Sequence, residues 1–252
     1  MSADGSRVAA IIVTHNSERF LPELIASIQG QTRAPDKIII IDDGSSDQTI
    51  AMVREVGWTV VTATTTATDV SSRIAQNFTQ GLRVAQDFDT AVFGDHDDYW
   101  LPDRVEHQVH QLQQHPDLWM LASGARIMGS SETLRDTFPI PEDWDDLPRT
   151  KRLRYALRHS IATGGACAGR PAQLLDRVNK CTPVPAGWLH DRWWSLAATA
   201  RNAVAIDSHP VIEYRVQPDQ QVGLDQGRQA ARVPRIRFSD VQRSRDVVRL
   251  LR

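Results

Sequence analysis

The chain has 252 residues, of which 41% are hydrophobic and 24% are charged, and its formal net charge is −2. These values are ordinary for a folded protein of one large or two small domains, and they disfavour a strongly basic nucleic-acid-binding protein. Two cysteines are too few for a disulfide framework, no apolar run approaches the ~20 residues that span a bilayer, and no signal-peptide pattern opens the chain, so we expect a cytoplasmic protein.

The first half of the chain alternates apolar runs with helical patterns. Continuous apolar runs at 8–13 and 37–41 predict strands that are buried on both faces of a parallel sheet. Between them, Ser17 and Pro22 are typical of a helix N-terminus. We expect further strands over 58–61, 91–93 and 118–121, and helices over 49–56, 71–86 and 102–114. This order predicts an α/β fold with an open, mostly parallel sheet flanked by helices.

Polar turns follow three of these strands, at 14–17, 42–47 and 95–98. Because ligands of open parallel sheets bind at the carboxyl ends of the strands, we expect the three turns to converge on one crevice. The last turn brings together Asp95, Asp97 and Asp98, and like charges that close disfavour one another's ionisation. A divalent cation relieves such repulsion, and Mg²⁺ is typically bound by one or two carboxylates together with substrate phosphates. A turn with solvated acids is the ordinary alternative.

The signals weaken after residue 122. We expect a loop over 139–148, a short basic helix over 151–159, a helix over 173–180 and a strand over 211–214. A further helix opens at His190 and Asp191 and runs to about residue 200. The last stretch, 226–252, contains eight Arg and two Asp, so it carries a charge of +6 while the rest of the chain carries −8. Neither an internal repeat nor an interdomain linker is visible.

Short motifs follow one another over residues 8–223: IIVTHN, SIQGQT, IIIDDGSSDQT, RIAQNF, FGDHDDYWLPDR, TGG, HDRWW and EYR…VG. In this order they resemble the family 2 glycosyltransferases of the inverting GT-A type, and DHDDYW and HDRWW are most similar to its rhamnosyltransferase-like branch. The resemblance implies a GT-A fold, which is a Rossmann-like open sheet with a C-terminal acceptor-side region. It also implies one domain with a nucleotide-sugar-binding half, 1–122, an acceptor and catalytic-base half, 123–225, and a basic helical extension, 226–252.

The resemblance implies that a UDP- or dTDP-sugar binds across the first half. Thr14 and His15 would line the base pocket, and Asp43 would accept the N3–H of the pyrimidine. Arg73 would reach the base or the diphosphate. An ordinary polar loop histidine and an exposed helical arginine are the alternatives for His15 and Arg73.

The resemblance further implies a divalent metal, Mg²⁺ or Mn²⁺, on the diphosphate of the donor. Asp97 is the expected direct ligand, and Asp95 would contact the ribose or hold the metal through water. Related chains often carry a His where Gln217 stands, and a glutamine is a weaker ligand that binds through its carbonyl oxygen. Arg215 would compensate by pairing with phosphate.

Asp191 of HDRWW is the expected general base, which takes the proton of the acceptor hydroxyl as the new bond forms on the face opposite the diphosphate. One displacement of this kind inverts the anomeric centre. Gly165 and His190 would contact the donor, and His190 would alternatively orient Asp191. Nearby tryptophans offer flat faces to sugar C–H groups, although a tryptophan is more often simply part of a core; they are Trp188, Trp193 and Trp194.

These expectations describe a metal-dependent glycosyltransferase that acts on a polysaccharide, a lipid-linked glycan or a small natural product. Its basic C-terminal stretch would rest on the inner face of a membrane, or dock on the domain or on a second copy of the chain. No Gly-rich phosphate loop and no G-x-G-x-x-G follows the first strand, which disfavours nucleotidyltransferases and dinucleotide oxidoreductases. A non-catalytic nucleotide- or carbohydrate-binding protein of the same fold stays open as the alternative.

Overall fold

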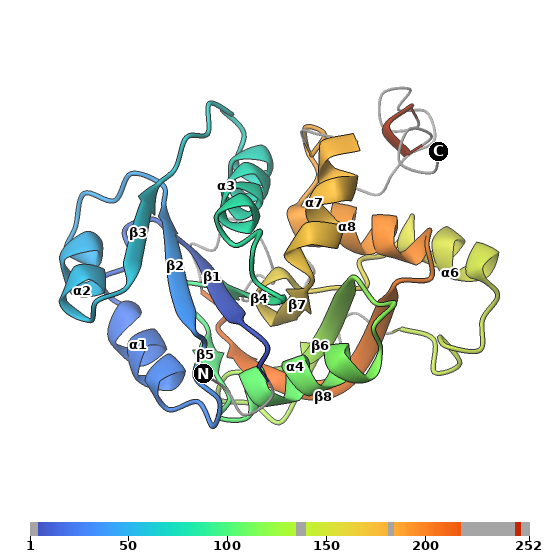
Figure 1. Ribbon diagram of the computed structural model, residues 1–252, viewed down its shortest axis with the longest axis horizontal. Coiled ribbons are helices and arrows are strands. Elements are labelled where there is room, and N and C mark those ends of the chain that lie inside the picture. The colour runs from blue at the N-terminus through green and yellow to red at the C-terminus, as the bar shows by residue number, and fades with distance from the viewer. Residues whose placement is uncertain (1–4, 135–139, 181–183, 218–244, 248–252) are drawn as a thin grey trace.

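The computed structural model describes residues 5–134, 140–180, 184–217 and 245–247, and Figure 1 shows how its elements are arranged. The first half of the chain forms β1 (Val8–Thr14), α1 (Leu21–Gln29), β2 (Lys37–Asp42), α2 (Thr49–Glu55), β3 (Thr59–Thr62), α3 (Val70–Val84), β4 (Thr90–Asp95), β5 (Tyr99–Trp100) and α4 (Arg104–Gln114). The second half forms β6 (Met120–Ile127), α6 (Arg149–Ala156), the 3₁₀ turn η1 (Gly164–Ala166), β7 (Cys167–Gly169), α7 (Pro171–Lys180), α8 (His190–Thr199) and β8 (Val204–Tyr214). Within the described ranges, no helix is long and apolar enough to cross a bilayer.

The first part of the sheet is parallel and buried on both faces, as predicted. β1 lies between β2 and β4 and pairs in parallel with both, and β3 adds to the outer edge of β2. Every residue of β1 is buried. Because successive side chains of a strand point to opposite faces, Ile11 packs into the core under α3 while Ile12 packs into the core over α1. This explains why β1 has an uninterrupted apolar sequence.

The carboxyl ends of β1, β2 and β4 lie at the same edge of the sheet. Thr14 pairs with Asp42, and Val13 pairs with Asp95. The turns that follow these strands therefore begin side by side, which confirms their expected convergence.

The described strands continue into one mixed eight-stranded sheet in the order β3-β2-β1-β4-β7-β6-β8-β5. β7 runs antiparallel to both of its neighbours, whereas β6 and β8 are parallel to each other. The sequence did not predict β5 or β7, because strands of two and three residues are too short to show an alternating pattern. It also predicted only the last residues of β8, since the earlier ones include Asp207, Ser208 and Pro210. The expected division after residue 122 falls within β6, so both halves of the chain share this sheet.

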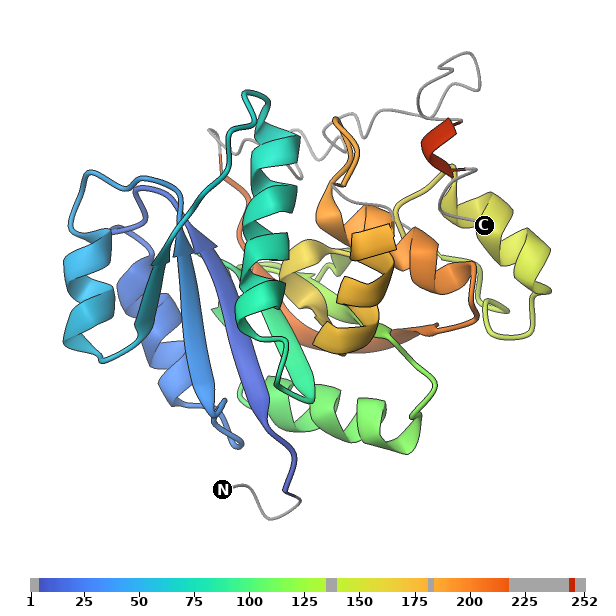
Figure 2. The same cartoon turned by 45° about the horizontal axis from the view of Figure 1, so that its top comes forward.

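Helices cover both faces of the sheet. α3, α7 and α8 pack on one face, where their apolar residues form one core cluster, and α1, α2 and α4 pack on the other with a second cluster (Figures 1 and 2). α6 lies beside α8 at the end of the molecule opposite α2 in both views. The core therefore has two layers, one on each face of the sheet. Polar turns lie at the edge where β1, β2 and β4 end.

The start of α1 differs in part from the prediction. Ser17 does not cap α1, which begins at Leu21; instead the Ser17 hydroxyl accepts a hydrogen bond from the backbone N–H of His15 at 3.2 Å, and fastens the turn. Pro22 lies in the first turn of α1, as predicted. The expected helical extension at 226–252 lies outside the described residues except for 245–247, which are helical.

Candidate active site

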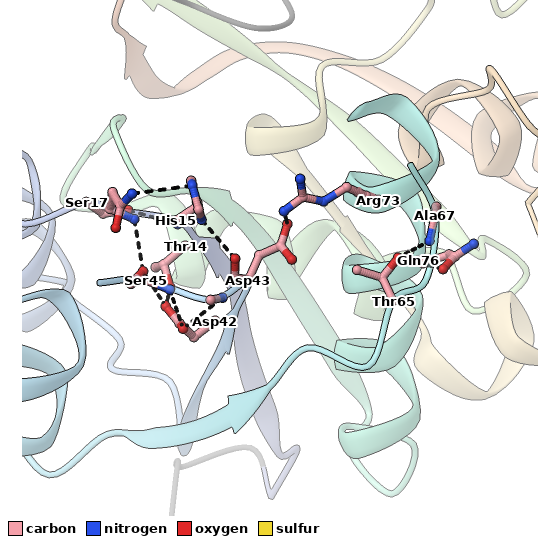
Figure 3. Close-up of polar contacts among 12 residues, drawn as sticks. Thr14, His15, Ser17, Asp42, Asp43, Ser45, Thr65, Ala67, Arg73 and Gln76 are labelled. Atoms are coloured by element: carbon pink, nitrogen blue, oxygen red, sulfur yellow. Dashed lines mark hydrogen bonds and ion pairs between the residues drawn. The ribbon is translucent and has the colours of Figure 1, made fainter. Parts of the chain in front are cut away.

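The first two turns are fastened to each other by Asp42. Its carboxylate accepts hydrogen bonds from the Thr14 hydroxyl (3.1 Å), the Ser45 hydroxyl (2.6 Å) and the backbone N–H groups of Gly44 and Ser45 (3.1 and 3.0 Å) (Figure 3). Gly44 has a φ of 78°, in the left-handed region that glycine adopts without strain, and this lets the turn fold back over the carboxylate. Asp42 is 2% exposed and fully engaged, so it braces the turns rather than facing a ligand.

Asp43, in the turn after β2, and Arg73, in α3, point toward each other (Figure 3). Their carboxylate and guanidinium form an ion pair at 2.7 Å, with the two side chains 17% and 37% exposed. His15 lies beside them, and its Nδ1 donates to the backbone carbonyl of Asp43 at 2.8 Å. The structure thus brings three of the predicted nucleotide-binding residues together at an accessible edge, next to Thr14, which is buried.

The acidic turn after β4 is a cluster of carboxylates. Asp98 is 2% exposed, and its Oδ1 accepts the backbone N–H of Arg215 at 3.2 Å. Its Oδ2 has no hydrogen-bond partner in the part of the chain that the structure describes. Burial, and then repulsion from Asp97 and Asp95, raises the pKa of Asp98 well above its usual range. Burial, and then repulsion from Asp97 and Asp191, raises the pKa of Asp95 to about 7. Asp191, nearly a hundred residues away in sequence, therefore acts on the same cluster.

Two adjacent glycines in η1 lie between this cluster and Asp191. A Cβ on Gly165 would lie 2.5 Å from Asp98 Oδ2 and 2.8 Å from Asp95 Oδ2. A Cβ on Gly164 would lie 3.0 Å from His190 Nε2 and 3.7 Å from Asp191 Oδ2. Gly165 therefore borders the acids, and its neighbour borders the start of α8. A side chain at either position would be too close to these groups. The two glycines therefore allow the acidic turn and the start of α8 to lie on either side of the same short segment.

Asp191 lies in the first turn of α8 and is 8% exposed. Its Oδ1 accepts the backbone N–H of Arg192 at 2.7 Å. Burial raises the pKa of Asp191 to about 6, although hydrogen bonds to the backbone N–H groups of Arg192 and Gly164 partly oppose that rise. Such a carboxylate is ionised at neutral pH and holds a proton more strongly than a solvated one, as a general base requires.

His190 packs in an aromatic cluster and makes no polar side-chain contact within the described residues. Its ring stacks on Phe78 with centroids 3.8 Å apart and meets Trp194 edge-on at 5.0 Å. Among the described residues neither ring nitrogen has a hydrogen-bond partner, so His190 makes no such bond to Asp191. Burial lowers its pKa to about 3, which keeps the ring neutral.

The three tryptophans predicted as possible sugar contacts are buried. Trp188, Trp193 and Trp194 are at most 2% exposed and belong to the core cluster of α3, α7 and α8. All residues of α8 are buried, including its polar first turn. The alternative of core packing is therefore correct for all three.

Residues that follow β8 close over the acidic turn. Arg215 donates from Nε to the backbone carbonyl of Asp97 at 2.9 Å, and its guanidinium pairs with Glu23 of α1. Gln217 donates its amide nitrogen to Asp97 Oδ2 at 2.6 Å. As a metal ligand, Gln217 would have to present its carbonyl oxygen instead. Arg215 would likewise have to leave Glu23 to reach a phosphate.

Arg104 is a component of this site that the sequence reasoning missed. It is fully buried, its guanidinium lies 3.8 Å from the ring centroid of Trp100, and it donates to the backbone carbonyl of Phe93 and to Gln108. Its charge favours the ionised forms of Asp95 and Asp98, and burial lowers its own pKa to about 9. The available signal was the i, i+4 spacing of Arg104 and Gln108 with Leu112, which places both polar residues on the core face of α4.

The donor set of this cluster fits a hard divalent cation that also binds phosphate. Within the described ranges, no group of three or more His, Cys, Asp or Glu side chains is arranged to hold a metal. Mg²⁺, however, is commonly held by one or two carboxylates plus substrate oxygens. The buried, unpartnered Oδ2 of Asp98 and the mutual repulsion of the three acids agree with that mode.

Comparisons with known proteins agree with this architecture. A family model described as glycosyl transferase family 2 matches residues 9–178. Over 50 residues, 20% of this chain and 16% of the relative, the sequence is 36% identical to the O-antigen chain rhamnosyltransferase RfbN of Salmonella typhimurium.

Similar solved structures share the fold at low sequence identity. TarS 1–349 of S. aureus in complex with UDP-GlcNAc aligns with a TM-score of 0.64 and 19% identity over 85% of this chain and 60% of that one. Glucosyl-3-phosphoglycerate synthase of Mycobacterium tuberculosis, in complex with Mn²⁺, UDP and glucosyl-3-phosphoglycerate, aligns with a TM-score of 0.60 and 20% identity over 85% of this chain and 74% of that one. The expected GT-A fold is thereby confirmed. The chain matches 16% of RfbN and 60% of TarS 1–349, in both cases less than two thirds of the relative's length.

Proposed function

Because the chain belongs to glycosyl transferase family 2, we propose that it is an inverting enzyme that moves a sugar from a nucleotide-sugar donor to an acceptor hydroxyl. The observation that carries this proposal is the approach of the acidic turn and Asp191 to each other around Gly164 and Gly165. Transfer needs both parts, since one acts on the leaving diphosphate and the other on the incoming hydroxyl. In this proposal, residues 1–122 bind the donor and 123–225 supply the base and the acceptor side.

We propose a UDP- or dTDP-sugar as the donor, bound at the edge formed by the first two turns. TarS and glucosyl-3-phosphoglycerate synthase have both been solved with UDP, which supports a pyrimidine nucleotide. Asp43 carries an accessible carboxylate for the pyrimidine N3–H, beside His15 and Thr14. Arg73, paired with Asp43, keeps that carboxylate oriented and offers further N–H groups to the base or the diphosphate.

We propose that Mg²⁺ or Mn²⁺ is held by Asp97, with Asp95 beside it and Gln217 as a further oxygen donor. The metal would neutralise the charge that develops on the departing diphosphate. Arg215 would add a phosphate contact after it leaves Glu23. The synthase of M. tuberculosis was solved with Mn²⁺, which supports this cofactor.

Asp191 is the proposed general base. It removes the proton of the acceptor hydroxyl while that oxygen attacks the anomeric carbon from the side opposite the diphosphate, and this inverts the configuration. Burial excludes water from the carboxylate and raises its proton affinity. His190 holds the start of α8 by packing on Phe78, so it positions Asp191 without exchanging a proton.

Replacing Gly165 with alanine is expected to lower kcat/KM by about a hundredfold, because a misplacement near 1 Å in a reacting group has that order of effect. The new Cβ would lie within 3 Å of both Asp95 and Asp98 and would displace their carboxylates. Gly164→Ala is the matched comparison, since its Cβ meets His190 instead. The affinity for UDP in the presence of Mn²⁺, measured by isothermal titration calorimetry, should be weaker for Gly165→Ala and near the wild-type value for Gly164→Ala. Wild-type kinetics for Gly165→Ala would contradict the close approach of the two acids.

The activity is tested by incubating the full chain with UDP- and dTDP-sugars and Mn²⁺, with and without soluble acceptor glycans, and by measuring released nucleoside diphosphate. We expect release with one donor class and a product of inverted anomeric configuration by NMR. A rise in Tm with the same nucleotide and metal would identify the donor independently, because a ligand that binds only the folded state stabilises it. Nucleotide binding without turnover of any donor would instead favour the non-catalytic binding protein.

A further inference from the structure

α6 and the turn that follows it form a strongly basic surface. Residues 149–158 contain five basic side chains and no acidic one. They are Arg149, Lys151, Arg152, Arg154 and Arg158. Such a concentration of one sign contrasts with the net charge of −2 for the whole chain.

Three of the five basic residues face away from the core, and the other two contact the end of α8. Lys151 and Arg154 of α6 and Arg158 of the turn after it are spaced by three and four residues, so they lie on one side, and all three are exposed. None of their side chains has a hydrogen bond or an ion pair within the ranges that the structure describes. Leu153 and Ala156 pack into the core on the opposite side. We call Lys151, Arg154 and Arg158 the outer face of α6.

The other two basic residues attach α6 to the helix that carries the proposed base. Arg149 donates to the carbonyl of Ala200 at 3.5 Å, and Arg152 donates to the side chain of Asn202 at 3.1 Å, both just beyond the end of α8. At the other end, Arg192 donates to the carbonyl of Leu157 at 3.4 Å. Arg192 is the neighbour of Asp191. A surface that binds the outer face of α6 would therefore be held close to the acceptor side of the site.

An acidic turn precedes α6, and among the described residues its acids make no ion pair with the outer face. Residues 142–146 contain four acids around Trp144. Trp144 is 3% exposed and packs edge-on against Tyr155, with ring centroids 6.0 Å apart. Tyr155 follows Lys151 by four residues, so this contact holds the acidic turn beside the outer face. Within the ranges that the structure describes, however, none of the four acidic side chains forms a hydrogen bond or an ion pair with Lys151, Arg154 or Arg158.

We propose that the outer face of α6 docks on an anionic phospholipid surface. The face has no apolar side chain to insert, so it would rest on headgroup phosphates and be screened by salt. α6 lies at the end of the molecule in both Figure 1 and Figure 2, and the three cations of its outer face are exposed. The three cations project from a convex surface and do not surround a cavity. They can therefore each meet a different phosphate of a bilayer, whereas they could not enclose a single anion. In line with the proposed function, docking would bring a membrane-bound acceptor to Asp191, but the binding itself does not depend on catalysis.

The test is co-sedimentation of the full chain with vesicles of phosphatidylcholine, alone or with about 30% phosphatidylglycerol, at about 50 and 300 mM NaCl. We expect binding only to the anionic vesicles, and weaker binding at the higher salt. The triple variant Lys151→Gln, Arg154→Gln, Arg158→Gln should bind at least about fivefold less, since each charge adds to the attraction. The matched control is Lys37→Gln, Arg54→Gln, Arg83→Gln, which removes the same charge from exposed positions on other elements and should stay within about twofold of wild type.

Several results would overturn the proposal. They are equal binding of the triple variant and wild type, equal binding to neutral vesicles, and binding to soluble polyphosphate without binding to anionic vesicles. Nucleotide release with a soluble acceptor separates this proposal from the function. The triple variant should turn over like wild type in that assay. If the chain turns over no donor but still binds vesicles through the outer face, the docking proposal stands and only the proposed activity is wrong.

Discussion

Replacing Asp191 with asparagine is expected to lower kcat by about a thousandfold, within the range that general bases contribute. The amide has nearly the same shape as the carboxylate but cannot take the acceptor's proton. The fold should tolerate the change, because burial already disfavours the charged form of Asp191. Nucleotide affinity, measured by titration with UDP and Mn²⁺, should match wild type, since the variant leaves the first two turns and the acidic turn intact.

The pH dependence of kcat should identify the same group. Burial raises the pKa of Asp191 to about 6, and a base acts only when it is ionised. The rate should therefore fall about tenfold per unit as pH decreases below that value, and Asp191→Asn should lose this dependence. Asp117→Asn, at an exposed position after α4, is the control and should leave the profile unchanged. Wild-type kcat in Asp191→Asn would refute the assignment of the base.

Asp97→Asn should produce the second large loss. A metal on the leaving diphosphate contributes several kcal/mol to the transition state, so the loss of its main ligand should lower kcat/KM by about a thousandfold. Affinity for Mn²⁺ in the presence of UDP, followed by electron paramagnetic resonance, should fall in parallel. Gln217→Ala removes the amide that donates to Asp97 and should weaken Mn²⁺ binding far less, because glutamine is the weaker ligand. Unchanged Mn²⁺ affinity in Asp97→Asn would assign the metal to another group.

The parts of the fold that could be predicted from sequence are those whose signal is local. The apolar runs of β1 and β2 identify strands buried on both faces, and the turns after them follow from the parallel sheet. β7 is a strand only because it fits between β4 and β6, and its three small residues contain no pattern of their own. The parallel pairing of β6 with β8 likewise depends on segments distant in sequence.

The candidate site divides in the same way. The acids of the turn after β4 and Asp191 could be chosen from their motifs, and the structure brings them near one another. Arg73 could be chosen too, but its ion pair with Asp43 connects residues 30 positions apart and needed the structure. For the tryptophans the sequence left sugar contact open beside the more frequent core packing. The structure decides for the core, because the whole of α8 is enclosed although it opens with His, Asp and Arg. The spatial role of Gly164 and Gly165 depends entirely on what lies opposite them.

Arg104 has a consequence for the catalytic cycle as a whole. In the proposed reaction, a metal held by Asp97 would supply positive charge only while the donor or the nucleoside diphosphate is bound. The guanidinium of Arg104 belongs to the fold, where Trp100 and the carbonyl of Phe93 hold it, and its charge stays beside Asp95 and Asp98 between turnovers. In that reaction, Arg104 would keep part of the charge of Asp95 and Asp98 balanced after the products leave.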